Sequence, residues 1–286
     1  MKRKLFCEIN SFTYAISVAK MCAIRLVKNS LSRRRFAAEK GDPLPVCVYK
    51  HSSLIRRRLG EVDMRLQENK AVNLSLAAPK ISGVCIRPGE VFSFWGLVGY
   101  YARWKGYKEG LTIASGKVTK GIGGGLCQMT NLIHWLVLHS PLDIVEHHHH
   151  DSVDLFPDYG RQVPFGCGTS IFYNYLDYRF CNNTSDTFQI LLYTTGTHLC
   201  GELRASAPQV YSYHIKEEDA HFVKTRDGVY RKNAIVRRVV EKRTGNEAGR
   251  EILKRSNARV LYDESLINQA LLREVQTPGS HKENAK

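Results

Sequence analysis

Hydrophobic residues recur at helical spacing in three stretches of the chain. Over residues 11–39 the apolar side chains fall three or four positions apart, which predicts an amphipathic helix. A second helical rhythm covers residues 47–76 and ends at Asn73-Leu74. The third stretch follows the glycine-rich segment 121–126 and predicts one central, buried helix that ends before Pro141. The apolar positions are Phe12, Ile16, Ala19, Ala23, Leu26 and Val27 in the first stretch, and Met129, Leu132, Ile133, Leu136 and Val137 in the third.

Several short segments have the β-branched and aromatic composition of strands. Residues 169–181 and 187–195 are of this kind, and the turn-forming residues 182–184 join them. Further strands are predicted at residues 91–94, after an Arg-Pro-Gly turn, and at 197–206.

The tail of the chain has a different, charged character. From about residue 208 it predicts a hairpin around residues 244–246 and then a helix that runs to Glu274. Together these patterns predict an α+β fold, in which an antiparallel β-sheet packs on a central helix that begins at a glycine-rich turn. The predicted segments are a basic helical N-terminal arm (1–40), a core domain (41–207) and a basic C-terminal extension (208–286).

Composition narrows the class of protein. The chain has 286 residues, of which 43% are hydrophobic and 10% aromatic, so it can bury a core and is not disordered over most of its length. The net charge of +15 is concentrated at the ends. Residues 1–40 carry ten basic and two acidic side chains, whereas residues 41–215 have a net charge of only +2. Basic ends of this kind are compatible with a solvated surface, an anionic membrane or nucleic acid, although no clear nucleic-acid signature is present.

The N-terminal arm resembles a secretory signal only in its basic head. Glu8, Asn10 and Lys20 interrupt the apolar stretch, and no run of about 18 apolar residues exists, so neither export nor a spanning helix is predicted. We therefore expect a cytoplasmic or peripherally membrane-associated protein. The apolar stripe of the arm is expected to dock on the chain's own core. The alternative is that the stripe lies on an anionic membrane, with basic residues beside it.

Eight cysteines are spread singly through the sequence, with no CxxC pair. This distribution predicts reduced, mostly buried thiols and no structural zinc site. Cys127 stands apart, because it follows Gly123, Gly124 and Gly125 and opens the central helix. A helix N-terminus favours a thiolate, and the bare amides of a glycine turn can bind an oxyanion, so we expect a lowered Cys127 pKa. The other interpretation is a small residue at a tight packing contact.

A cysteine nucleophile needs a proton acceptor nearby, and the histidine run at 147–150 is the candidate source. In an extended segment alternate side chains share a side, so His148 and His150 pair, as do His147 and His149. Asp151 follows as a supporting residue. A polar loop and a transition-metal site built from these histidines are alternatives, but no other ligand cluster completes a metal site. We therefore predict neither metal nor cofactor.

The motifs PGEVFSFW (88–95), GYKEGLTIASGKV (106–118), GGGLCQMTNLI (123–133) and LDYRFCNNT (176–184) resemble, in order and spacing, those of the VanW family. That family takes its name from glycopeptide-resistance clusters, and VanW-like domains of cell-wall proteins are linked to L,D-transpeptidase activity. The resemblance implies a cysteine acyl-transferase acting on peptidoglycan stem peptides, with Cys127 as nucleophile and Gln128 as part of the motif. It also places the two histidines of the family at His148 and His150.

One departure from the family bears on the site. Relatives carry an Asp-Ala-Thr element where this chain has Gly168-Thr169-Ser170. An orienting carboxylate would then have to come from Asp151 or Asp158. The departure keeps open a second hypothesis, a non-catalytic protein associated with glycopeptide resistance that retains the fold. A membrane- or nucleic-acid-associated module that uses its basic ends is a third.

Overall fold

The computed structural model describes residues 5–57, 63–114, 117–149, 152–158 and 160–274. Its centre is a four-stranded antiparallel sheet in the order β2 (Val46–Leu54), β11 (His198–Ala205), β10 (Phe188–Thr194) and β3 (Val84–Ile86). Alternate residues of β11 are buried, as expected for a sheet with one covered face. The predicted α+β class is therefore confirmed.

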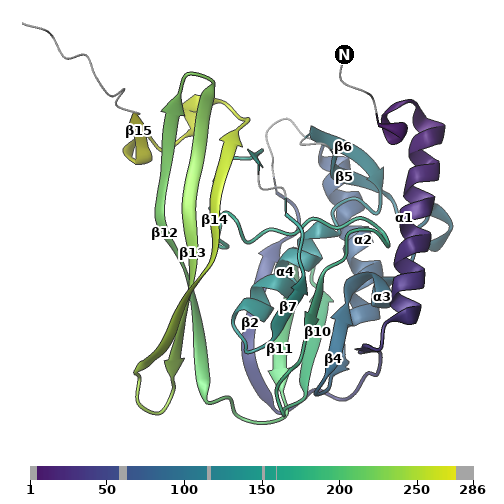
Figure 1. Cartoon of the computed structure of the whole chain (residues 1–286), viewed down its shortest axis with the longest axis vertical. Coiled ribbons are helices and arrows are strands. Elements are labelled where there is room, and N and C mark those ends of the chain that lie inside the picture. The colour runs from purple at the N-terminus through teal and green to yellow at the C-terminus, as the bar shows by residue number, and fades with distance from the viewer. Residues whose placement is uncertain (1–4, 58–62, 115–116, 150–151, 159, 275–286) are drawn as a thin grey trace, which may run out of the picture.

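Two helices cover the buried face of this sheet (Figure 1). Helix α2 (Met64–Ile81) lies on β10, and α4 (Cys127–Leu138) lies on β11 and β2. Leu132 and Leu136 of α4 approach Gly201 of β11 so closely that a Cβ there would lie 3.1 Å from each side chain. The apolar stripe predicted for the central helix is thus the surface that packs on the sheet, and all five of its residues are buried.

A smaller sheet lies next to this core. Its order is β1 (Arg35–Phe36), β4 (Glu90–Ser93), β9 (Arg179–Cys181) and β7 (Asp143–Glu146), and the rings of Phe92 and Phe180 stack at 4.7 Å. The short helices α3 (Phe94–Val98) and η2 (Arg103–Lys105) follow β4, and the hairpin β5 (Glu109–Ala114) and β6 (Lys117–Ile122) leads into α4.

The C-terminal extension supplies three long strands of a further sheet, which stands beside the core (Figure 1). These are β12 (Tyr211–Thr225), β13 (Gly228–Glu241) and β14 (Glu247–Val260), with β15 (Leu272–Glu274) and β8 (Val153–Asp154) at the edges. Trp135 and Leu138 of α4 pack against Ile235 of β13, so the extension is joined to the outer side of the central helix. The three segment boundaries remain a prediction.

The N-terminal arm is helical, as predicted, but its apolar stripe faces away from the core. Short helix η1 (Phe6–Glu8) precedes α1 (Ser11–Leu31), which begins where the side chain of Asn10 accepts a hydrogen bond from the amide of Thr13 at 2.9 Å. The expected burial of the apolar stripe is wrong, because Phe12 is 72% and Ile16 42% exposed, and Ala23 is exposed too. The inner face of α1 is held instead by polar contacts of Cys22 and Arg25.

Three other predicted elements are corrected by the structure. Residues 46–54 form the strand β2, not a helix, because the segment alternates in burial and pairs along β11. Most of 169–178 is irregular, and only Arg179–Cys181 is strand. The hairpin turn at 244–246 is confirmed, but the segment after it is the strand β14 followed by short helical turns, η3 (Glu264–Leu266) and η4 (Gln269–Leu271).

The cysteines are also less buried than expected. Of the eight, only Cys167 is buried, Cys47 is exposed and the others are intermediate. Within the described residues, no helix has the length and apolar character required to cross a membrane.

Candidate functional site

Three different neighbours leave no room for a side chain at the glycine turn before α4. Gly123 and Gly125 have φ of 73° and 91°, a region that favours glycine. A Cβ on Gly123 would lie 2.7 Å from the ring of Tyr101, and one on Gly125 would lie 2.2 Å from the side chain of Lys70. A Cβ on Gly124 would meet the carbonyl carbon of Gly110 at 2.2 Å. The triple glycine therefore lets α4 begin inside a closely packed site.

This turn leaves two amides available at the start of α4. In the described part of the chain, the N–H groups of Gly125 and Cys127 donate to no carbonyl oxygen, whereas those of Gln128 and Met129 bond back to the turn. The helix dipole adds positive potential at the same place. These two amides are the candidates for the predicted oxyanion site, and the amide of Cys127 also hydrogen-bonds its own sulfur.

The thiol of Cys127 is held in its protonated form. Burial raises its pKa above the ordinary value of 9.0, and this effect outweighs the opposing hydrogen bonds from the amides of Ile171 and of Cys127 itself. The expectation of a lowered pKa is therefore wrong for the free protein. The two amide hydrogen bonds favour the thiolate, but the loss of water around the sulfur is the larger effect.

Residues 169–173 pass beside Cys127 and are fastened to α4. The amide of Thr169 donates to Asn131 at 2.7 Å, and the hydroxyls of Thr169 and Thr130 are hydrogen-bonded. Thr130 and His134 are buried. Thr130 and His134 therefore face no open cleft, because the 169–173 segment packs against this part of α4.

Tyr101 was not predicted and belongs to the site. Its ring lies on Gly123, and its hydroxyl is close enough to Cys127 for the two groups to interact electrostatically. Burial, with the neighbouring Cys127 as a smaller cause, raises the pKa of Tyr101 to about 12. This phenol therefore stays protonated. Nothing in the sequence around Tyr100-Tyr101 distinguishes it from an ordinary core aromatic residue.

The histidine segment alternates in direction, as predicted, but its odd-numbered members face α4. The imidazole of His147 stacks on that of His134 at 4.3 Å and donates from Nε2 to the carbonyl of Gly168 at 2.8 Å. His148 points the other way, to the Glu146 carboxylate at 3.0 Å. In the part of the chain that is described, no hydrogen bond joins Cys127 to an imidazole. His150 and Asp151 lie outside the described residues.

The other predicted supporting residues have different partners. Gln128 donates to the hydroxyl of Ser53 at 2.8 Å and to the carbonyl of Leu54, so its amide reaches β2 and not the thiol. Asp158 pairs with Arg231 at 2.6 Å and with Arg161 at 2.7 Å, which excludes it as the orienting carboxylate. A Cβ on Gly168 would lie 2.8 Å from Nε2 of His149.

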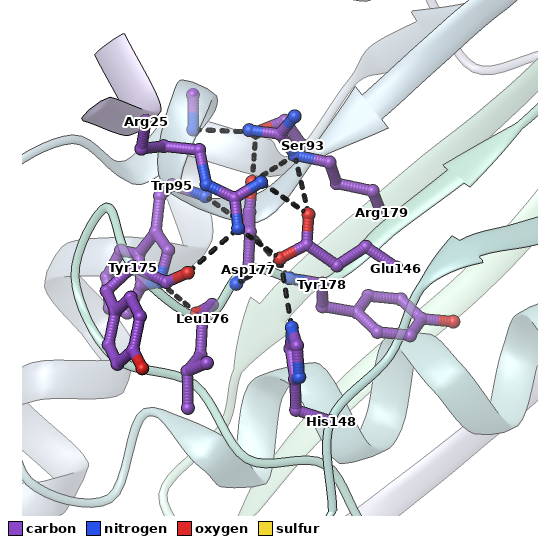
Figure 2. A network of polar contacts seen from close by, with 11 residues as sticks. Arg25, Ser93, Trp95, Glu146, His148, Tyr175, Leu176, Asp177, Tyr178 and Arg179 are labelled. Carbon is purple, nitrogen blue, oxygen red and sulfur yellow. Dashed lines mark hydrogen bonds and ion pairs between the residues drawn. The ribbon is translucent and has the colours of Figure 1, made fainter. Parts of the chain in front are cut away.

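A buried polar network lies beside the histidine segment and was missed by the sequence reasoning (Figure 2). The carboxylate of Asp177 accepts from the Ser93 hydroxyl at 2.5 Å, the Trp95 amide at 3.0 Å and Nε of Arg179 at 2.6 Å. Glu146 connects this group to α1, because Arg25 donates to both of its oxygens at 2.7 and 2.6 Å. The network fixes β7, β9 and α1 relative to one another.

The charge state of Glu146 follows from these contacts. Burial raises its pKa, but hydrogen bonds from Arg25, the Asp177 amide and His148 lower it more, so the pKa lies below its ordinary value of 4.5. Glu146 is therefore a carboxylate at neutral pH, and it holds His148 in place.

A cavity of about 660 Å³ opens on the adjacent side of α4. Gln128 and Asn131 form its helical wall, and Cys127 is not among the described residues that line it. Its other walls are unusually basic, with side chains from β2, from the segment after it and from the 156–164 loop. They include His51, Arg56, Arg57, Arg161 and His198.

Arg57 is the most exceptional of these basic groups. Burial and the neighbouring Arg161 lower its pKa, and its guanidinium has no acidic partner among the residues that the structure places. An unpaired, partly buried guanidinium favours an anionic ligand. No group of three or more potential metal ligands is found in the described parts of the chain.

The structure therefore defines an α+β protein in which a cysteine at a glycine-initiated helix adjoins a basic cavity. The family model "VanW like protein" matches residues 69–204. Over 219 residues the chain is 33% identical to the vancomycin B-type resistance protein VanW of Enterococcus faecalis, which covers 77% of this chain and 79% of the relative. It is 32% identical over 118 residues to the uncharacterized protein YoaR of Bacillus subtilis, covering 40% and 36%. No solved structure matches significantly. The chain belongs to the VanW-like family.

Proposed function

We propose that this protein is a cysteine acyl-transferase that acts on peptidoglycan stem peptides, with Cys127 as the nucleophile. The observation that carries the proposal is the pair of amides at Gly125 and Cys127, which donate to no carbonyl in the described residues and lie at the N-terminal start of α4, the helix that Cys127 opens. Such amides stabilise the oxyanion that forms when a carbonyl is attacked.

The reaction has two steps. The sulfur of Cys127 attacks a peptide carbonyl carbon, the C–N bond breaks, and the amine leaves with the proton from the thiol, which gives a thioester. A second amine then attacks the thioester, forms a new amide bond and returns its proton to the sulfur. Because burial keeps the resting thiol protonated, a base has to act in the first step. We propose that a histidine of the 147–150 segment supplies this base, the role that the family resemblance implies for His148 and His150.

The basic cavity supports the assignment of the substrate class. Stem peptides carry free carboxylates, and Arg57, which has no acidic partner among the described residues, lines the same cavity as Gln128. The name of the Enterococcus relative links that protein to vancomycin resistance. We extend the association with glycopeptide resistance to this chain as part of the proposal.

A non-catalytic, resistance-associated binding protein is the second candidate. It is favoured by the raised pKa of Cys127 and by the engagement of His147 and His148 with other partners. Under this hypothesis the cavity binds the stem peptide and no bond is exchanged.

A peptide-exchange assay separates the two hypotheses. The purified protein is incubated with a synthetic stem tetrapeptide and an excess of an amine acceptor, and products are followed by mass spectrometry. The wild-type chain and Cys200→Ser, which changes a partly exposed thiol on the outer side of the sheet, should form the exchange product. Cys127→Ser should not. Exchange that persists in Cys127→Ser excludes this nucleophile, and peptide binding without exchange in all three proteins favours the second candidate.

A further inference from the structure

The outer face of α1 is an uncovered apolar stripe. Leu26 is 60% and Val27 56% exposed, and ten of the 26 large hydrophobic side chains that are exposed in the described residues fall within residues 5–31. The stripe continues past the N-terminal end of α1 into η1. Its members are Leu5, Phe6, Ile9, Phe12, Ile16, Ala19, Ala23, Leu26 and Val27.

This orientation is fixed by specific contacts on the opposite side of the helix. The thiol of Cys22 donates to the carbonyl of Tyr173 at 3.3 Å, and Asn174 donates to the carbonyl of Cys22 at 3.0 Å. Arg25 forms the paired hydrogen bonds to Glu146. A helix in water normally turns its apolar side to the core. Here the side that carries Cys22 and Arg25 is anchored to the core, and the apolar stripe on the opposite side is left for another medium.

The charges around the stripe identify that medium. Between residues 9 and 38 the sequence contains no Asp or Glu, and residues 1–40 have a net charge of +8. Lys20 lies one turn after Ile16 at the edge of the stripe, Lys28 is exposed in the last turn, and the exposed basic residues 33–35 follow directly. Apolar side chains bordered by lysine and arginine match the boundary between acyl chains and anionic headgroups.

We propose that α1 lies flat on an anionic membrane surface, with its apolar stripe inserted below the headgroups. Figure 1 shows α1 at one side of the molecule, away from the C-terminal sheet, so that neither this sheet nor the core obstructs its outer face. The inner face of α1 contacts residues 173–175, which continue the segment that covers Cys127. The candidate site would therefore lie about one helix diameter, roughly 10 Å, above the membrane surface.

Vesicle co-sedimentation tests this proposal with the full-length chain. We expect binding to vesicles of phosphatidylcholine mixed with phosphatidylglycerol, weak binding to phosphatidylcholine alone, and loss of binding in high salt. The triple variant Phe12→Gln/Leu26→Gln/Val27→Gln should lower binding at least tenfold. Because these side chains are exposed, the variant should keep the wild-type circular dichroism spectrum. Lys20→Gln and Lys28→Gln should each lower binding about fivefold.

A matched control alters three exposed apolar residues of the C-terminal region. Val210→Gln/Ile252→Gln/Leu261→Gln changes side chains that are 61%, 51% and 49% exposed, and it should bind vesicles like the wild type. Equal loss in both triple variants, or binding that ignores anionic lipid, would overturn the proposal. So would light scattering that shows a dimer broken by the α1 variant, because the stripe would then be a contact with a second copy of the chain.

Discussion

The substitution Asp177→Asn should strongly destabilise the protein. Asp177 is 1% exposed, and its Oδ1 accepts from the amides of Trp95 and Tyr178, which an asparagine oxygen can still do. The other oxygen, Oδ2, accepts from the hydroxyl of Ser93 and from Nε of Arg179. In the variant an NH₂ group would face these two donors, so both hydrogen bonds would be lost.

The magnitude follows from the kind of bond that is lost. A hydrogen bond to a charged group contributes about 1.5–3 kcal/mol, and breaking a buried ion pair costs about 3–5 kcal/mol. Arg179 keeps a weaker contact with Glu146 at 3.6 Å, which reduces the cost. We therefore expect the free energy of unfolding to fall by about 3 kcal/mol, or Tm by about 6–12 °C.

Urea denaturation followed by tryptophan fluorescence measures this change directly. The matched control is Glu68→Gln, because Glu68 forms a hydrogen-bonded pair with Arg56 at 2.6 Å on the surface, with 56% of its side chain exposed. The control should unfold at the wild-type urea concentration. If Asp177→Asn lost less than about 1 kcal/mol, the network would not be what holds β9 and α1 together.

Three further predictions concern single groups. Lys70→Met should raise the free energy of unfolding at pH 7 by about 1–3 kcal/mol, because burial and then the charges of Arg57 and Arg56 lower the pKa of Lys70 to about 8. This gain should shrink above pH 8, where the folded wild type holds a neutral amine. A gain that stays constant with pH would refute the buried charge of Lys70 as its cause. Burial lowers the pKa of His139 to about 4, so wild-type stability should fall as pH drops from 6.5 towards 4, and urea titrations of His139→Phe should show a shallower decline. Limiting iodoacetamide at pH 7 should label exposed Cys47 before Cys127, as peptide mapping would show; first labelling of Cys127 would contradict the raised pKa.

Local pattern was sufficient where one physical effect decided the structure. The stripe from Met129 to Val137 is apolar at every helical repeat, follows glycine and precedes proline, so both the helix and its buried side could be predicted. Residues 46–54 show the limit of the same method. Their mixed basic and apolar residues fit either the helical or the strand repeat. They form a strand because they pair with β11, which is distant in sequence.

The candidate site, too, could be predicted only in part from the sequence. The amides of Gly125 and Cys127, which donate to no carbonyl oxygen in the described residues, follow from the adjacent glycines and could be predicted. The pKa of the thiol could not, because it depends on burial and on the amide of Ile171, which reaches the sulfur only in the folded chain. The direction of α1 was also beyond a sequence pattern. Its periodicity located the apolar stripe, but the contact of Arg25 with Glu146, 121 residues away, decides which face is turned outward.

Intact-protein mass spectrometry after mixing with a stem tetrapeptide tests the central claim most directly. The account predicts a mass increase equal to the acyl part of the peptide, located by peptide mapping on Cys127 and removed by hydroxylamine, as expected for a thioester. Cys200→Ser should form the same adduct, and Cys127→Ala should form none. An adduct on another residue, or none at all under conditions where the peptide is demonstrably bound, would contradict the assignment of Cys127 as the nucleophile.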